Sequence, residues 1–330
     1  MDETADYMRV CEKAVRTGGA VIQDWIGRFK ISKKGHADLV TEADLASQEA
    51  IRQTVLGAFP DHCLLGEEKP AGDAPQCRGD CPDFRARTRS GCEKMGTGSE
   101  PTCAIPARSV SGEVPVPIFS QPFPAKIGTV QRRAEYRWIT DPLDGTTNYA
   151  HGVPHYCVSL ALERSGNLLV GAVYDPVLDE CFTAAAGRGA RLNERPIATS
   201  RVAELSEALA AVGFPPDVQP NSPDLLVFLE MLHHCQAIRR TGSSALNLCY
   251  LAAGRFDVYW SYSTKIWDVA AGALILREAG GAITSPAGGD FMLETGHFLA
   301  AANEKLHAQL QKVATSVVKI VDSHPQRRID

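Results

Sequence analysis

The stretch from Trp138 to Tyr149 reads WITDPLDGTTNY, a short apolar run followed by two aspartates three positions apart. Proline fixes its own φ and disfavours a helical conformation in the residue before it, so Pro142 predicts an extended turn. Such a turn directs the Asp141 and Asp144 carboxylates and the Leu143 carbonyl toward one point. Hard cations such as Mg²⁺ favour a shell made of oxygen ligands. The loop therefore predicts a divalent-metal site.

The residues after Asp144 add a second chemical feature. Glycine lets the backbone come close to a ligand, and free N–H groups at a helix start bind phosphate. A helix beginning near Gly145 would present the Gly145 and Thr146 N–H groups in this way. Ordinary capping of that helix is the alternative interpretation of Asp141 and Asp144.

Two further acidic clusters occur far away in the chain. Glu67 and Glu68 follow a short strand at Leu64 and Leu65, and Asp268 opens a helix after Trp267. Each cluster stands at the end of an expected element, where side chains from different segments converge. For Asp268 taken alone, an N-cap role is the alternative.

The hydrophobic pattern predicts a mixture of helices and strands. Apolar residues at helical spacing indicate helices over 4–27, 41–59, 225–234, 243–253 and 267–279; Thr41 is the predicted N-cap of the second helix, which Pro60 stops. Alternating residues indicate strands from Tyr136, over 156–163, 168–174, 180–184, 208–212 and 257–260, and over 298–301. The order has no strict strand–helix–strand repeat, so we expect layered sheets with helices between them, in one domain spanning 1–330 with lobes of about 1–200 and 201–330.

Residues 69–135 differ from the rest of the chain. They hold nine of the 20 prolines and seven of the 28 glycines and have no sustained hydrophobic period. This composition predicts a disordered insertion, either a genuine surface loop or a gene-model artefact. Four cysteines (Cys77, Cys81, Cys92 and Cys103) also lie here, and a zinc site is an alternative, although no C-x-x-C pair is present.

Composition narrows the possible functions. The chain has 330 residues, 44% hydrophobic and 22% charged, with a formal net charge of −5. This balance supplies no general basic field for a nucleic acid, so we expect no nucleic-acid and no membrane partner. The start, MDETADYMRV, lacks the basic and apolar pattern of a secretory signal, which predicts a cytoplasmic location and reduced cysteines.

Four motifs in order resemble those of the inositol monophosphatase family. They are LVTEAD at 39–44, GEE at 66–68, WITDPLDGTTNY at 138–149 and WDVAAG at 267–272. The resemblance covers nearly the whole chain apart from 69–135. It implies an α/β (α+β) fold, the layered αβαβα sandwich of the inositol monophosphatase and fructose-1,6-bisphosphatase type.

The same resemblance implies roles for single residues. Glu67, Asp141 and the Leu143 carbonyl would hold one Mg²⁺; Asp141, Asp144 and Asp268 would hold a second, and a third ion would lie near Glu67. Asp44 and the Thr146 hydroxyl would orient and activate the attacking water, without a covalent phosphoenzyme. Homodimers are usual in the family, so a homodimer is expected.

Two serines lie on the expected substrate side. Ser261 stands where inositol-specific members of the family usually have glutamate, and Ser244 stands where alanine is common. The missing glutamate weakens an inositol assignment but does not affect the metal ligands. A structural role for either serine is the alternative.

The sequence thus predicts a Mg²⁺-dependent phosphate monoester hydrolase, most simply an inositol-1-monophosphatase. Because a shared metal core does not fix the leaving alcohol, histidinol phosphate, a nucleotide 3′-phosphate or bisphosphate, and fructose bisphosphate are alternative substrates. From other classes, an inactive scaffold and a zinc or redox module are also alternatives.

Overall fold

Two long helices begin the fold. α1 spans Glu3–Asp24 and α2 spans Glu42–Ala58, close to the predicted 4–27 and 41–59. α1 buries one face, with Val10, Ala14 and Ile22 among its buried residues. α2 starts after Thr41 because the Asp44 carboxylate accepts the Thr41 backbone N–H at 2.8 Å, which satisfies a group at the helix start.

This computed structural model describes residues 2–33, 39–68 and 135–323, which belong to one unit formed by Met1–Cys77 and Ala134–Asp330.

A seven-stranded sheet packs on these helices. Its order is β3-β4-β5-β6-β7-β8-β9, and only β3 and β4 run parallel. The bounds are β3 Cys63–Gly66, β4 Tyr136–Asp144, β5 Cys157–Arg164, β6 Asn167–Asp175, β7 Glu180–Ala185, β8 Ala190–Leu192 and β9 Arg195–Pro196. A tight turn joins β5 and β6: Ser165 and Gly166 both have positive φ, as a two-residue hairpin loop requires.

Both faces of this sheet are covered. Along β5, Val158, Leu160 and Leu162 join the core beneath α1 and α2, whereas Cys157 and Ala161 join the core on the opposite face. Because successive side chains of a strand point to opposite faces, this division explains why seven of its eight residues are buried.

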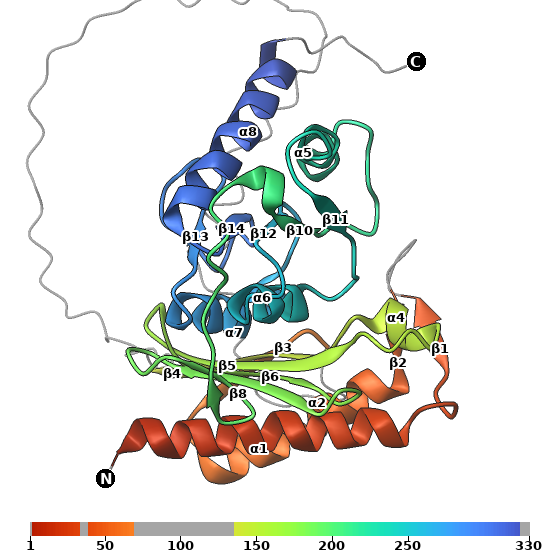
Figure 1. The fold of residues 1–330 in the computed structure, drawn as a ribbon. Coiled ribbons are helices and arrows are strands. Elements are labelled where there is room, and N and C mark those ends of the chain that lie inside the picture. Colours follow the sequence, from red (N-terminus) through yellow and green to blue (C-terminus); the bar gives the residue numbers. More distant parts are fainter. Residues whose placement is uncertain (1, 34–38, 69–134, 324–330) are drawn as a thin grey trace, which may run out of the picture. The chain divides into compact units, whose positions relative to one another are not determined.

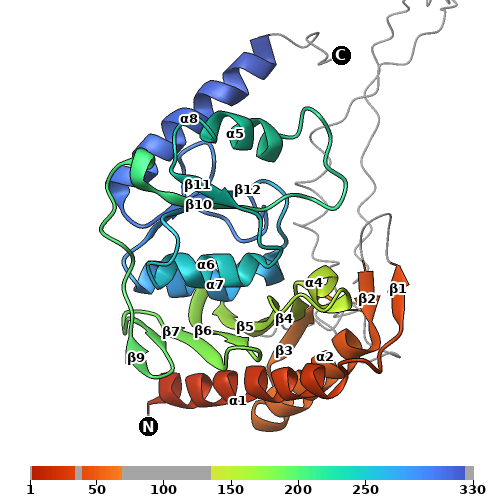
Figure 2. The same ribbon diagram turned by 45° about the vertical axis from the view of Figure 1, so that its right-hand side comes forward.

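The second sheet has five strands in the order β11-β10-β12-β14-β13. The bounds are β10 Leu209–Val212, β11 Ala237–Arg239, β12 Val258–Ser261, β13 Ala282–Thr284 and β14 Phe298–Ala301. α6 (Ser244–Ala252) and α7 (Ile266–Glu278) lie between the two sheets, while α5 (Pro223–Met231) and α8 (Glu304–Ser323) pack together beyond the second. Figures 1 and 2 show the resulting sequence of helix pair, sheet, helix pair, sheet and helix pair. The predicted layered αβαβα sandwich is confirmed.

Several elements differ from the expectations. The sequence pattern missed the small hairpin of β1 (Ile31–Lys33) and β2 (Leu39–Thr41), the strands β8, β9, β11 and β13, and the whole of α8. α5 ends at Met231, earlier than the predicted 234. Except for Glu135, the segment 69–135 lies outside the described residues, as do its four cysteines. Its predicted disorder, the zinc alternative and the division into two lobes stay predictions.

The cysteines are described in part. Cys11, Cys157, Cys181, Cys235 and Cys249 are free thiols. Cys63 is disulfide-bonded, so the expectation of reduced cysteines is wrong at this position. Among the helices that the structure describes, none has the length and apolar character needed to cross a membrane.

Candidate active site

Asp44 and Thr146 come together from segments 102 positions apart. The Thr146 hydroxyl lies 3.2 Å from Asp44 Oδ1 and 2.9 Å from the Leu143 carbonyl oxygen, so it donates its single proton to one of two acceptors. Thr41 holds the other Asp44 oxygen through its hydroxyl at 2.6 Å and its N–H. Asp44 is completely buried. The pair that the sequence predicted is therefore assembled and oriented.

Asp141 and Asp144 lie at the end of β4, as the extended turn predicted. The pairing of β4 with β5 shifts register between these two residues, and Asp144 pairs again with Cys157, so the strand is bent locally there. Asp141 Oδ1 accepts the Leu143 N–H at 3.0 Å. Gly145 follows with φ 95°, a conformation that favours glycine, and α4 (Thr146–Ala150) then begins. The predicted helix start near Gly145 is confirmed.

Asp144 is fixed by the start of α6. Its Oδ2 accepts the Ser243 hydroxyl at 2.6 Å and the Ala245 N–H at 2.7 Å, and its Oδ1 lies 3.3 Å from the Ser244 N–H. A carboxylate is favoured at a helix N-terminus because the first N–H groups have no partner within the helix. Asp144 thus links the first sheet to a helix of the middle layer.

Asp268 occupies the first turn of α7, where it accepts the Lys265 N–H at 2.7 Å. This contact partly supports the capping alternative, although Asp268 is the third residue of the helix and Lys265 is the N-cap. Glu67 follows β3, and its N–H donates to the Thr140 carbonyl at 3.2 Å. β4 is thereby tied directly to the Glu67 loop.

The four carboxylates influence one another electrostatically. Burial raises the pKa of Asp141 well above its usual range, and the charges of Glu67, Asp144 and Asp268 raise it further. Burial also raises the pKa of Asp144 to about 6, against the hydrogen bonds from Ser243 and Ala245. Burial and the charge of Asp144 raise the pKa of Asp268. The site accumulates negative charge that a bound cation would offset.

The acidic side chains do not converge on a single point as the ligands of a metal ion do. Within residues 2–33, 39–68 and 135–323, no three Asp, Glu, His or Cys side chains form a group arranged to hold one ion. The carboxylate oxygens instead turn to nearby N–H and hydroxyl donors. The donor set still fits a hard cation, because it consists of oxygen atoms and includes buried carboxylates that raise one another's pKa.

The two predicted substrate-side serines are placed differently. Ser261 ends β12 and is fully buried, with its hydroxyl 3.4 Å from that of Ser263. Ser244 opens α6, and its N–H faces Asp144. Ser244 therefore lies beside the carboxylate site, whereas the hydrogen bonds of the Ser261 hydroxyl are with Ser263.

Two positioning side chains were not predicted. Gln48 donates to the Glu68 carbonyl at 2.7 Å and accepts the Glu68 N–H at 3.0 Å, which clamps the loop that carries Glu67. Ser243 binds Asp144 and also accepts the Leu246 N–H at 3.2 Å as the N-cap of α6. A serine before an apolar helical run does signal an N-cap in sequence, but its contact with Asp144 spans 99 positions and has no local signal.

Comparisons with known proteins agree with this arrangement. The model of the inositol monophosphatase family matches residues 4–319. An inositol-1-monophosphatase from Mesorhizobium japonicum is 41% identical over 304 residues, covering 91% of this chain and 92% of that protein. A Pseudomonas aeruginosa protein named Nus factor SuhB is 33% identical over 312 residues, covering 93% and 95%.

A solved structure gives the same result for the fold. The inositol monophosphatase from Anabaena has a TM-score of 0.69 and 31% identity, covering 95% of this chain and 96% of that one. The matches extend over nearly the full length and include all four motifs. The chain belongs to the inositol monophosphatase family.

Proposed function

We propose that this chain is a Mg²⁺-dependent phosphate monoesterase whose substrate is inositol monophosphate or a similar polyol phosphate. Family membership supports phosphatase activity. The observation that carries the metal requirement is the placement of Asp141, which is buried and lies close enough to Glu67, Asp144 and Asp268 for their charges to act on it. A site of this charge repels a phosphate dianion unless cations bind first.

The proposed ligands follow the motif positions. Glu67, Asp141 and the Leu143 carbonyl hold one ion; Asp141, Asp144 and Asp268 hold a second, and a third, looser ion lies near Glu67. Bound Mg²⁺ lowers the pKa of a coordinated water and offsets charge on the phosphate and the leaving oxygen. The chain supplies the fixed oxygen atoms, two of them on residues anchored at helix starts.

The other residues act on the water and the phosphate. Thr146 donates a hydrogen bond to Asp44, and its oxygen accepts a hydrogen bond from the attacking water, which orients that water for displacement. As the Thr146 oxygen takes the proton of the water, it passes its own hydroxyl proton to Asp44. The N–H groups of Gly145 and Thr146, at the start of α4, hold the phosphate oxygens. Ser244, beside Asp144, contacts the alcohol part of the substrate.

The test measures phosphate release from inositol, histidinol, nucleotide and fructose phosphates, with and without Mg²⁺. We expect turnover that requires Mg²⁺ and is highest with inositol monophosphate. Asp141→Asn removes a ligand, and it should abolish both turnover and calorimetric Mg²⁺ binding while leaving the thermal melt cooperative. Asp61→Asn, a change at an exposed carboxylate, is the control. Metal-independent turnover, or normal turnover of Asp141→Asn, would contradict the proposal.

The substrate panel also separates the remaining alternatives. Preference for histidinol phosphate, a nucleotide 3′-phosphate or fructose bisphosphate would keep the metal chemistry and change the alcohol. The name Nus factor SuhB, carried by a relative 33% identical over 312 residues, favours a second candidate, a binding role that does not need hydrolysis. Absence of turnover on every phosphate, with intact Mg²⁺ binding, would favour that role. A cytoplasmic location and a homodimer remain part of the proposal.

A further inference from the structure

A cavity of about 950 Å³ lies between α1 and the β7–β8 hairpin. Its lining residues come only from Thr4 to Ala20 and from Thr183 to Arg191. The helix α1 packs on β5, β6 and β7, whereas α7, which carries Asp268, packs on the opposite face of the same sheet. β4 and β7 are three strands apart, roughly 14 Å at the usual strand spacing. The cavity is therefore separate from the candidate active site.

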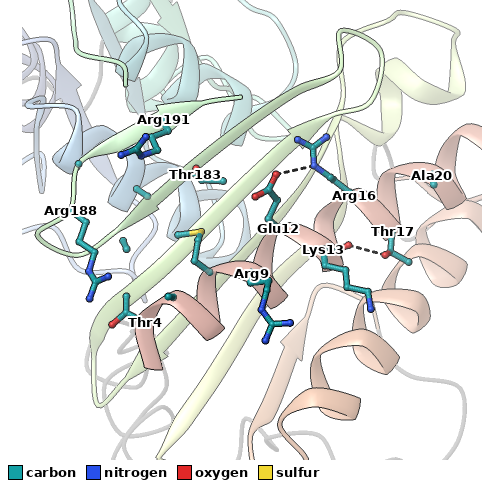
Figure 3. Close-up of a pocket in the computed structure, with 15 residues that line it drawn as sticks. Thr4, Arg9, Glu12, Lys13, Arg16, Thr17, Ala20, Thr183, Arg188 and Arg191 are labelled. Atoms are coloured by element: carbon teal, nitrogen blue, oxygen red, sulfur yellow. Dashed lines mark hydrogen bonds and ion pairs between the residues drawn. The ribbon is translucent and has the colours of Figure 1, made fainter. Parts of the chain in front are cut away.

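The wall formed by the hairpin presents two arginines. Thr183 pairs with Arg191 across β7 and β8, and directly opposite residues point to the same face of a sheet. Cys181 and Ala185, which alternate with Thr183, belong to the core beneath α1, so Arg191 stands on the α1 side. Arg188 lies in the turn between the two strands. Figure 3 shows both arginines on the hairpin side of the cavity.

The helical wall presents a third arginine on a partly apolar floor. Arg16 contacts Glu12 at 3.0 Å and Asp179 at 3.2 Å, and its guanidinium lies 4.9 Å from the centre of the Tyr174 ring. Figure 3 shows Glu12 and Arg16 facing the strands and Arg9 and Lys13 on the outer side of the helix. Met8, Ala184 and Ala185 supply the apolar surface. Five cationic residues and one carboxylate, Glu12, thus line or border the cavity, in a chain whose net charge is −5. Three of these cations also pair with carboxylates outside the lining, namely Asp2, Asp6 and Asp179.

The two hairpin arginines are available to a ligand, and Arg16 would exchange its ion pair with Asp179, whose side chain is 79% exposed. Arg188 pairs with Asp2, but the two side chains are 50% and 49% exposed, and exposed ion pairs contribute only about 0–1 kcal/mol. Arg191 donates to the Glu194 carbonyl at 2.9 Å and has no carboxylate partner among the described residues. Guanidinium groups bind phosphate and carboxylate with paired N–H donors, so exchange of these weak contacts for a polyanion is favourable.

We infer that this cavity is a second, non-catalytic site for a small molecule that carries two or more phosphate or carboxylate groups. A single anionic group would engage one wall, whereas a ligand with two groups engages Arg16 on the helix and Arg188 and Arg191 on the hairpin together. The volume lies within the range of small-molecule sites, roughly 300–1,000 Å³. The alanine and methionine side chains contact the part of the ligand between its charges.

Tripolyphosphate is the probe, titrated calorimetrically into the full chain after divalent ions have been removed on a chelating resin, with no soluble chelator present. Without divalent ions the carboxylates of the active site repel a polyanion, so binding under these conditions reports the cavity alone. We expect one site per chain, weakened about tenfold by Arg188→Ala and by Arg191→Ala, since each removes a charge-assisted contact. Arg195→Ala, an exposed arginine on β9 that does not line the cavity, is the matched control. Orthophosphate should bind much more weakly.

The inference has clear contrary outcomes. Equal binding to the wild-type chain, both cavity variants and the control would place the anion elsewhere and overturn it. So would absence of binding combined with a change of sedimentation in Arg191→Ala, because a second copy of the chain would then cover this face. Neither readout involves hydrolysis, so failure here leaves the proposed phosphatase activity untouched, and normal tripolyphosphate binding survives a failed activity test.

Discussion

The Thr146 hydroxyl has two acceptors and only one proton. It lies within hydrogen-bond distance of Asp44 and of the Leu143 carbonyl, which is also a proposed metal ligand. Donation to Asp44 leaves the carbonyl lone pairs available to an ion, so in the proposed mechanism Asp44 and Thr146 act as a unit. Removing either one should lose nearly the whole effect of the unit.

Thr146→Ala and Asp44→Asn should each lower kcat by about 10²- to 10⁴-fold, the usual scale for a positioned proton-transfer group. Mg²⁺ affinity should change little because neither side chain is a proposed ligand. The double variant should be scarcely slower than either single one, and Thr147→Ala, at the exposed neighbouring position, should turn over normally. If steady-state kinetics gave a double variant whose loss of kcat equals the product of the two single losses, Asp44 and Thr146 would act independently.

Asp224 provides a test by pH away from the metal ligands. Burial raises its pKa to about 6, and the Tyr262 N–H, which donates to Oδ1 at 2.7 Å, opposes that rise. Between about pH 4 and 6 the folded chain keeps a proton that the unfolded chain has lost, so stability falls as pH rises through this window.

The expected loss is on the order of 3 kcal/mol across the window, and Asp224→Asn should remove it while keeping an oxygen for Tyr262. Urea unfolding at a series of pH values gives the free energy of unfolding of both proteins. The difference between the two values isolates Asp224, because all other titrating groups are common to both chains. Parallel profiles for the two proteins would show that Asp224 has an ordinary pKa.

At the scale of elements, helix starts decide where the acidic side chains point. Asp44 and Asp268 are each the third residue of a helix and bind the N-cap N–H, and Asp144 binds the first N–H groups of α6. Three of the carboxylates in the site are therefore held by backbone donors rather than by flexible side chains. Ser243 is the side chain that joins one of these starts to β4.

Ser243→Ala should cost about 1 kcal/mol through the lost N-cap and should also weaken Mg²⁺ binding, because Asp144 loses its hydroxyl donor. Ser222→Ala is a matched control: Ser222 is the N-cap of α5 but makes no side-chain cap bond. Thermal melts and calorimetric Mg²⁺ titrations distinguish the two effects. An unchanged Mg²⁺ affinity in Ser243→Ala would make Ser243 a purely structural cap.

The sequence predicted those elements whose signals are local. Thr41 followed by Asp44 marked the start of α2, and the Asp141–Asp144 spacing marked the end of β4. α8 was not predicted, although the buried residues Leu306, Leu310 and Val313 follow helical spacing and the local signal for a helix is present. β1 and β11 are three residues long and depend on their neighbours for pairing. The hydrogen bond between Gln48 and Glu68 joins residues 20 positions apart and exists only in the folded chain, so no local sequence pattern predicts it.

At the scale of the whole molecule, the segment 69–135 separates the GEE motif at 66–68 from the WITDPLDGTTNY motif at 138–149. The family match runs from 4 to 319 and the motifs on both sides of the segment are complete, so the described residues contain all the proposed ligands. Loop-closure entropy grows slowly with length, which lets a fold accept a long insertion between β3 and β4.

Replacement of residues 72–132 by a short Gly-Ser linker should therefore preserve Mg²⁺-dependent turnover and increase resistance to limited proteolysis. Activity, Mg²⁺ titration and digestion of the shortened and full chains provide the comparison. Loss of Mg²⁺ binding with an unchanged melting temperature would mean that the segment helps to build the active site.

The link between Asp144 and the first turn of α6 has a consequence for biosynthesis. A ribosome releases the chain from the N-terminus, so β4 leaves the exit tunnel about a hundred residues before Ser243, Ser244 and Ala245. Until then Asp144 has no helix to bind, and Asp268 follows later still. A nascent chain halted before α6 would leave Asp144 without its partners at the helix start, so the proposed site is completed only while the last third of the polypeptide is emerging.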